Sequence, residues 1–256
     1  MSNETDDKLP RSLEVLWKRA NRHPRGPQQA LSLERIVAAA IKLADAEGLQ
    51  ALSMARLAER LGCATMSLYR HVANKDELLV FMMDTAPGNP PVIDVAVLGW
   101  RGGLERWARE LRAFYYRHPW SLQITPSGPP LEPGQLAWLD SCLRTMAGTG
   151  LSPPDKLGVC FLLLQYVRGE AQLNLSMSQA KELPDWNSRE MQAWYGRTLA
   201  GLIDAERFPA LAEISAAGVF EPGGGDAGPS PEFDFGLSRI LDGIEPLVRA
   251  AAQRQV

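Results

Sequence analysis

Two short helical patterns on either side of a glycine constrain this chain more than any other feature of its sequence. In the segment Ser53–His71, Leu57 and Leu61 recur at helical spacing, and a second short helix is expected over residues 65–71. Gly62 opens the turn of three to four residues between them, where it permits a left-handed backbone that a β-carbon would oppose. The spacing predicts a helix-turn-helix, although a helical hairpin with a polar surface fits the same pattern.

The second of these helices is expected to present mostly polar side chains. Leu68 would pack inward against the first helix. The residues left outward are Thr65, Met66, Ser67, Tyr69, Arg70 and His71. Hydroxyl, aromatic and imidazole groups on a short helix suit the base edges and phosphates of a DNA major groove.

Helical patterns continue along the rest of the chain, and no strand-like alternation of useful length appears. Ser32 is a suitable N-cap for a helix that stops at Gly48, and Asn74–Glu77 resembles a capping box. Three prolines within Pro87–Pro91 predict a linker. Further helices are expected around 97–118, over 133–147, 155–180, 188–204 and 207–217, and in an apolar stripe over 237–251.

The patterns together predict an all-α fold with two domains. A flexible basic arm at 1–31, with room for a turn or two of helix near Leu13 and Trp17, precedes a three-helix helix-turn-helix domain at 32–85. A larger helical domain for ligand binding and dimerisation is expected at 92–256.

The charge is unevenly distributed along the chain. The formal net charge is −3, yet the stretch Lys8–Arg35 has seven basic against two acidic residues, or +5. From residue 86 onward, 15 basic residues face 19 acidic ones, or −4. A basic end on an acidic body suits a protein that places one end on phosphate, although such an arm is also often a solvated tail.

Residues 32–85 resemble the DNA-binding domain of the tetracycline-repressor (TetR) family. The resemblance is carried by Ala46–Gly48, by Leu57-Ala58 with Leu61-Gly62, and by Ser67–His71 leading into Asn74-Lys75. Beyond residue 90 it is weaker, and it is carried by His118–Trp120, Tyr166–Gly169 and Phe235–Gly243.

The resemblance implies roles for single residues. Thr65, Met66 and Ser67 match the start of the recognition helix, where the family meets bases, while Tyr69, His71 and Lys75 match phosphate contacts. Ser53, at the start of the preceding helix, is a further DNA-binding candidate. Ala55 stands where the tetracycline repressor itself has a base-reading arginine, so the operator sequence of that repressor cannot be assumed for this chain.

Two arginines of the arm are candidates as well. Arg22 and Arg25 would enter the minor groove if the arm becomes ordered on DNA, and the alternative is an arm that stays disordered.

No catalytic or cofactor motif is apparent, so we expect neither an enzyme nor a bound cofactor or metal. His23, His71 and His118 are not spaced for metal binding, and no phosphate loop or serine elbow occurs. Three separated cysteines favour a reducing compartment, the cytoplasm. No run of 18 apolar residues predicts a membrane span.

The second domain is expected to bind a small-molecule effector between its helices. The candidate pocket residues are Trp107, Phe114, Trp120, Phe161, Gln165 and Arg168. Gln165, Arg168 and Gln172 share one helical face, which equally fits a dimer seam or a solvated stripe. The resemblance implies a homodimer built by the last helix and the helix over 155–180.

The resulting prediction is a ligand-responsive repressor that leaves its DNA operator when an effector binds. The alternatives are an activator or an effector-independent repressor of the same fold, or an enzyme or interaction module on a helical scaffold.

Overall fold

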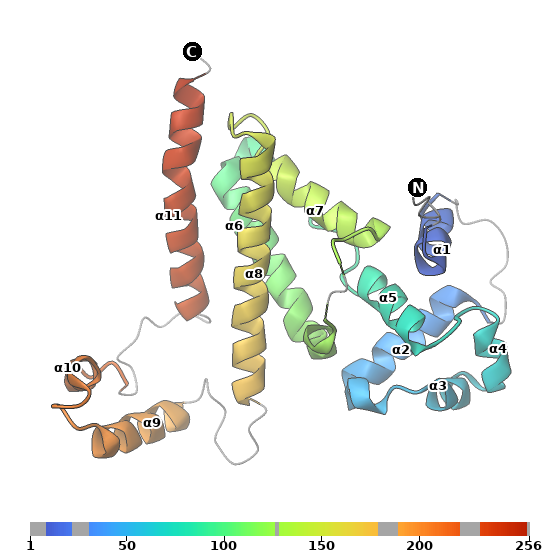
Figure 1. Ribbon diagram of the computed structural model, residues 1–256, viewed down its shortest axis with the longest axis horizontal. Coiled ribbons are helices and arrows are strands. Elements are labelled where there is room, and N and C mark those ends of the chain that lie inside the picture. The colour runs from blue at the N-terminus through green and yellow to red at the C-terminus, as the bar shows by residue number, and fades with distance from the viewer. Residues whose placement is uncertain (1–8, 22–30, 126–127, 179–188, 221–230, 255–256) are drawn as a thin grey trace, which may run out of the picture. The chain divides into compact units, whose positions relative to one another are not determined.

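The fold of the chain is helical throughout the described residues, which are 9–21, 31–125, 128–178, 189–220 and 231–254 of a computed structural model (Figure 1). No β-strand occurs among them, and the predicted all-α class is confirmed. The chain divides into two compact units, Met1–Phe161 and Leu162–Val256. Helix α8 (Pro153–Ser178) begins in the first unit and ends in the second.

Four α-helices form the N-terminal module, which we define as residues 33–85. They are α2 (Leu33–Glu47), α3 (Met54–Leu61), α4 (Thr65–Tyr69) and α5 (Lys75–Thr85), with a 3₁₀ turn η1 (Leu49–Ala51) after α2. The predicted cap at Ser32 is present, since its hydroxyl accepts the Arg35 N–H at 3.3 Å. Helix α2 ends at Gly48, whose φ of 79° lies in the region that favours glycine.

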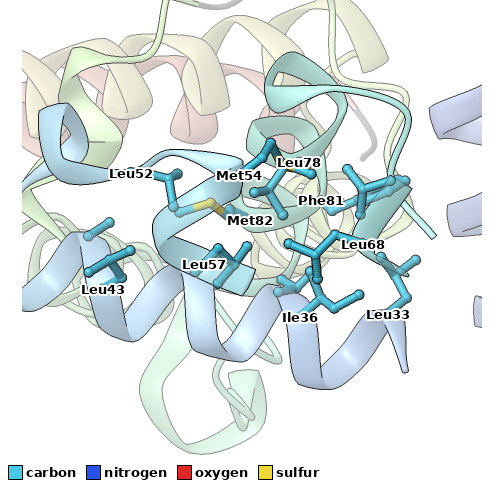
Figure 2. Packing of buried hydrophobic residues seen from close by; sticks show 14 of the residues in the cluster. Leu33, Ile36, Leu43, Leu52, Met54, Leu57, Leu68, Leu78, Phe81 and Met82 are labelled. Carbon is cyan, nitrogen blue, oxygen red and sulfur yellow. The ribbon is translucent and has the colours of Figure 1, made fainter. Parts of the chain in front are cut away.

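The core of the N-terminal module is apolar and drawn from all four helices (Figure 2). Ile36, Leu57, Leu68 and Phe81 come from α2, α3, α4 and α5 in turn, and each is completely buried. Burial of one such side chain contributes about 1.5–3 kcal/mol to folding. The same cluster includes Trp120, which comes from far outside the module in the sequence.

The predicted arm contains a helix longer than expected. Helix α1 (Arg11–Ala20) is ten residues long, and it packs on α5 and α7 (Pro133–Thr145) through the buried side chains of Leu13 and Leu16. The indole N–H of Trp17 donates to the carbonyl of Leu131 at 3.0 Å. Residues 9–21 are therefore a docked part of the first unit.

Helices α6 (Val95–Arg117) and α7 pack against each other after the linker, and the 3₁₀ turn η2 (Pro119–Gln123) follows α6. The expected stripe of Leu104, Trp107, Ala108, Leu111 and Phe114 is buried. A β-carbon on Gly103 would come within 3.2 Å of Ile93 and Thr145, so this glycine allows the close approach. At Gly99 (φ 66°, ψ 177°) the first turn of α6 is offset from the rest.

The compact unit thus extends beyond the predicted linker at 87–91. Residues 86–94 are non-helical, as expected there, but the Trp138 indole N–H donates to the Gly88 carbonyl at 2.9 Å. Helix α7 also contacts α5. The first helices after the linker are therefore packed with the N-terminal module.

The second unit holds the remainder of α8 with α9 (Arg189–Leu202), α10 (Pro209–Ala216) and α11 (Pro231–Gln253). Tyr166 of α8 stacks on Phe233 of α11 with ring centroids 5.6 Å apart, and its hydroxyl donates to the Phe233 carbonyl at 2.8 Å. A β-carbon on Gly236 would overlap the Tyr166 hydroxyl, so a glycine is required at this contact. In the predicted stripe of α11, Leu237, Leu241, Ile244 and Ala251 are buried.

Candidate nucleic-acid interface

The turn between α3 and α4 has the conformation that its glycine predicts. Gly62 adopts a left-handed backbone (φ 67°, ψ 36°), and the Cys63 N–H donates to the carbonyl of Ala58 at 3.0 Å. The Gly62 N–H also donates to the carbonyls of Ala58 and Glu59, so the end of α3 is closed by backbone bonds around this glycine. The two short helices are thereby held in the arrangement of a helix-turn-helix.

Helix α4 presents one buried residue and an otherwise accessible face. Leu68 is completely buried in the core of the N-terminal module, whereas Met66 is 70% and Tyr69 42% exposed. Thr65, Ser67 and His71 are half-buried and Arg70 is exposed. The outward set that the sequence predicted is therefore accessible, with polar, aromatic and thioether groups side by side.

The first turn of α5 is a second potential anion site beside α4. The Asn74 side chain accepts the Glu77 N–H at 2.8 Å, and the Glu77 carboxylate accepts the Ala73 N–H at 2.5 Å. This arrangement resembles the predicted capping box, except that Glu77 returns to the N–H of Ala73, one residue before the N-cap Asn74. Lys75 occupies the first position of the helix, where the helix dipole favours a phosphate.

Sequence profiles and solved structures identify the family. The profile described as "Bacterial regulatory proteins, tetR family" matches residues 36–80, and "Tetracyclin repressor-like, C-terminal domain" matches residues 98–248. The chain belongs to the TetR family. It is accordingly a transcriptional regulator of the helix-turn-helix type.

Relatives within the TetR family cover nearly the whole chain. The "HTH-type transcriptional repressor DrrR1" of Streptomyces coeruleorubidus is 39% identical over 252 residues, which is 96% of this chain and 88% of that protein. Apo ActR from Streptomyces coelicolor has a TM-score of 0.70 at 26% identity, covering 89% of this chain and 100% of that chain. ActR in complex with actinorhodin has a TM-score of 0.67 at 27% identity, covering 85% and 96%.

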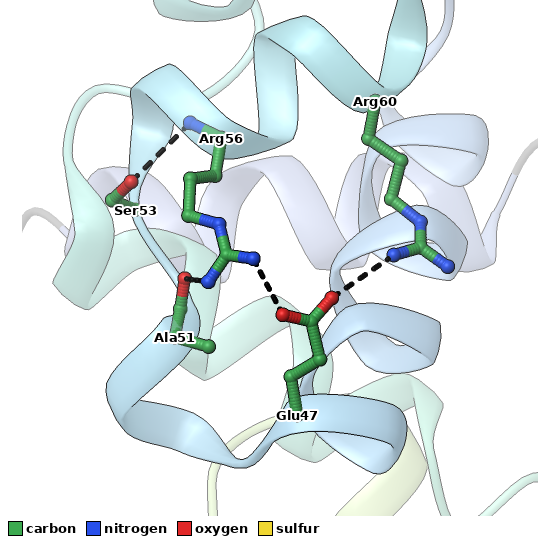
Figure 3. Close-up of polar contacts among 5 residues, drawn as sticks. All are labelled: Glu47, Ala51, Ser53, Arg56 and Arg60. Carbon is green, nitrogen blue, oxygen red and sulfur yellow. Dashed lines mark hydrogen bonds and ion pairs between the residues drawn. The ribbon is translucent and has the colours of Figure 1, made fainter.

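A carboxylate on α2 restrains the arginine beside Ala55 (Figure 3). Glu47 pairs with Arg56 at 2.5 Å and with Arg60 at 3.5 Å, and Arg56 also donates to the Ala51 carbonyl at 3.4 Å. Arg56 is therefore directed toward the end of α2. Sequence reasoning missed this network, because its partners lie on either side of Gly48 and no local pattern joins them.

The predicted DNA-binding residues outside α4 and α5 fall into two groups. The hydroxyl of Ser53 accepts the Arg56 N–H at 3.2 Å and so caps α3 (Figure 3). Arg22 and Arg25 lie outside the described residues. DNA contacts by these three residues stay predictions.

The aromatic candidates for the effector pocket are distributed over two clusters of the first unit. Trp107 is buried against Trp138, with ring centroids 6.1 Å apart, and donates to its carbonyl at 3.0 Å. Phe114 and Trp120 are buried on either side of His118, at centroid distances of 5.6 and 5.9 Å. These side chains fill the interior of the unit.

The remaining pocket candidates all belong to α8. Phe161 and Gln165 are exposed and Arg168 is half-buried. Phe161 ends the first unit, whereas Gln165 and Arg168 belong to the second. The effector pocket that would combine the six candidates stays a prediction.

Asp45 of α2 is a polar connection that sequence reasoning did not find. Its carboxylate oxygen lies 2.7 Å from Nδ1 of His118 and accepts the indole N–H of Trp120, also at 2.7 Å. Trp120 is the residue of η2 that enters the core of the N-terminal module. Asp45 therefore ties that module to the turn after α6.

Asp84 forms a second connection, between α5 and α7. Its carboxylate accepts the N–H of Gly134 at 2.6 Å, at the N-terminus of α7. Burial raises the pKa of Asp84 above its ordinary value, and the backbone N–H groups of Gly134 and Gln135 partly offset this effect. A β-carbon on Gly134 would overlap Asp84, so the glycine permits the contact.

Neither a metal-binding cluster nor a membrane-spanning helix is found in the described part of the chain. No group of three or more histidine, cysteine, aspartate or glutamate side chains is arranged to hold a metal ion there. Of the helices built from those residues, none has both the length and the apolar character needed to span a bilayer.

Proposed function

We propose that this TetR-family regulator is a transcriptional repressor that binds operator DNA as a homodimer and leaves it when a small organic effector binds. One observation carries the proposal: α4 follows a glycine turn, buries Leu68 and leaves Met66 and Tyr69 accessible. Similarity to DrrR1, a protein named as a repressor, favours repression over activation.

Recognition would combine two kinds of contact. Thr65, Met66 and Ser67 at the start of α4 read base edges in the major groove, while Tyr69, His71 and Lys75 hold the phosphate backbone. Ser53 adds a contact from the start of α3. Two copies of α4 would read two half-sites related by two-fold symmetry, which is why a dimer is required.

The effector is proposed to be a polycyclic aromatic compound. ActR, which resembles this chain over most of its length, has been solved with actinorhodin. A helical domain with many aromatic side chains and a few polar groups would suit a flat ligand with a few polar substituents. The proposed lining residues remain Trp107, Phe114, Trp120, Phe161, Gln165 and Arg168.

Two contacts would carry the effector signal to the DNA-binding helices. Displacement of η2 would act on α2 through Asp45, and displacement of α7 would act on α5 through Asp84. Since packed helices respond to small shifts as rigid bodies, either route would change the separation of the two α4 helices in a dimer.

We further propose that the protein acts by binding alone, without catalysis, and that it does so in the cytoplasm, where operator DNA is found. Membership of a regulator family supports both statements. The second candidate function is a regulator of the same fold without a small-molecule effector. Such a regulator would share the DNA interface, but no small molecule would release it from DNA.

A gel-shift titration with a duplex covering the region upstream of the protein's own gene tests the proposal. We expect a retarded complex at low salt that actinorhodin, or a related polycyclic aromatic compound, dissociates. If no duplex from this region is retained, DNA regulation at that site is wrong. If the complex forms but a broad panel of aromatic compounds neither dissociates it nor raises the thermal midpoint, the effector-independent alternative is favoured.

A further inference from the structure

The first turn of α5 has more negative than positive side chains, which is unfavourable at a helix end that should bind phosphate. Lys75 is followed directly by Asp76 and Glu77, so two negative charges accompany one positive charge. Glu77 is only 8% exposed. Removing a charge from water is costly unless that charge is paired, and an unpaired carboxylate here would also repel DNA.

Arg11 of α1 supplies a positive charge that pairs with Glu77. The guanidinium of Arg11, the first residue of α1, pairs with the carboxylate oxygen of Glu77 that also accepts the Ala73 N–H. Arg11 is 51% exposed. Leu13 and Leu16, which follow within the next one and a half turns and are buried, hold α1 in place, so the ion pair is part of a docked helix.

Helix α1 lies outside the segment that the TetR-family profile matches, residues 36–80. The capping arrangement of α5 within that segment nevertheless depends on a residue of α1. The carboxylate that accepts the Ala73 N–H is buried and is paired with Arg11. Without it, the charge favours rotation of Glu77 toward water, which would free the Ala73 N–H and loosen the first turn that carries Lys75.

We propose that Arg11 is a positioning residue for DNA binding, and that α1 is an accessory part of the DNA interface. Arg11 acts through Glu77: it fixes the first turn of α5, and thereby Lys75 and the free N–H groups, in the geometry that meets a phosphate. This proposal rests on the proposed function, because it assigns a role within the same DNA interface.

A double-mutant cycle separates this role from a general charge effect. We expect Arg11→Gln to weaken binding of the upstream duplex about ten-fold in a dimer that uses two such sites. In a Glu77→Gln background, where the neutral amide needs no cation, the same change should cost two-fold or less. Equal losses in both backgrounds would overturn the proposal, because Arg11 would then act on DNA independently of Glu77.

Two further variants keep the test decisive. Arg11→Lys preserves the charge and should restore most of the affinity, and a loss as large as that of Arg11→Gln would contradict the proposal. Lys18→Gln removes an equal charge from the same helix, about 10 Å further along its axis; it should have the smaller effect, and an effect as large as that of Arg11→Gln would also contradict the proposal.

Amide exchange and the wild-type protein provide the remaining controls. The Ala73 amide should exchange faster in Arg11→Gln while the thermal midpoint stays close to that of wild type. Unchanged Ala73 exchange would overturn the positioning role. If the wild-type protein itself fails to retain the duplex, the proposed function is at fault. If wild type and Arg11→Gln bind equally well, only the role of Arg11 is wrong.

Discussion

The N-terminal module and the second unit differ in how many large apolar side chains they expose to solvent. Within residues 33–85 only two large apolar side chains are exposed, Met66 and Tyr69, and both lie on α4. The described residues of the second unit expose many more. They are Leu162, Leu173, Trp194, Leu202, Phe208, Leu211, Ile214, Val219, Phe235 and Leu247.

This difference indicates which part of the molecule leaves apolar surface for a partner. The N-terminal module, whose core is completed by Leu16 of α1 and Trp120 of η2, exposes large apolar side chains only where DNA is expected. The second unit leaves apolar surface on α8, α9, α10 and α11, and an extended surface of this kind is typical of a face that a partner covers. A second copy of the chain is the partner that the proposed function requires.

Truncation of a core residue should give the largest effect. Leu68→Ala should destabilise the N-terminal module by about 2–5 kcal/mol, because it removes a completely buried side chain from α4. Urea denaturation measures this change in the free energy of unfolding. Met66→Ala, on the same helix but exposed, is the matched control and should leave stability nearly unchanged. Equal losses for the two variants would show that the module does not bury its core as described.

A charge on the exposed face of α11 should separate the subunits. Leu247 is 52% exposed, and we expect Leu247→Glu to weaken the dimer about a hundred-fold, since an uncompensated charge would enter an apolar interface. Sedimentation across micromolar concentrations measures the dissociation constant. Arg249→Ala, two residues away, loses only a pair with Glu245 one turn earlier and serves as control. A wild-type protein that sediments as a monomer would refute the dimer.

The contrast between the two regions also explains what the sequence could predict. Ser32, Gly48, Gly62 and Asn74 define the ends of their helices through local backbone chemistry, so the helices of the module were located correctly. The apolar stripe on α11 could also be predicted from the sequence, because the spacing of apolar residues along a helix is a local property.

Several contacts that sequence reasoning missed join residues far apart in the sequence. Asp45 and Trp120 are 75 residues apart, and Arg11 and Glu77 are 66 apart. No local pattern joins either pair, and only tertiary packing brings the partners together. The effector pocket was unpredictable for a related reason: aromatic spacing does not distinguish a ligand site from the interior of a domain.

Removal of Asp45 tests how strongly the stability of the module depends on its polar connection to η2. Asp45→Ala leaves the buried indole N–H of Trp120 without an acceptor and should cost about 1–3 kcal/mol in the free energy of unfolding. Asp45→Asn retains an acceptor oxygen and should cost less. If both variants unfold like wild type, Trp120 stabilises the module through packing of its ring alone. The hydrogen bond between Asp45 and η2 would then contribute nothing to the free energy of unfolding.

Two substitutions on α4 should separate affinity from specificity. Tyr69→Ala removes an accessible aromatic hydroxyl expected at the phosphate backbone, so we expect about ten-fold weaker binding to all duplexes. Ser67→Ala should instead change the preference at particular base pairs, with a smaller loss on average. Binding to the operator and to random duplexes of equal length measures both. A uniform loss in the Ser67 variant would contradict its assignment to bases.

The smallest effect is expected at the junction between α5 and α7. Since burial raises the pKa of Asp84, the folded protein holds this proton more tightly than the unfolded chain does. The contribution of Asp84 to stability is therefore greatest below the ordinary aspartate pKa and declines as the pH rises through the raised value. Asp84→Asn stays neutral and retains an oxygen that can accept the Gly134 N–H.

The stability of Asp84→Asn relative to wild type should consequently increase as the pH rises above the ordinary aspartate pKa of about 4. Urea titrations of both proteins at several pH values measure the difference, and Asp140→Asn, on the exposed face of α7, is the control. A difference that falls with pH would mean that the N-terminus of α7 stabilises the charged carboxylate more than burial disfavours it. In that case Asp84 would be a charged anchor that actively holds α7 to the DNA-binding helices.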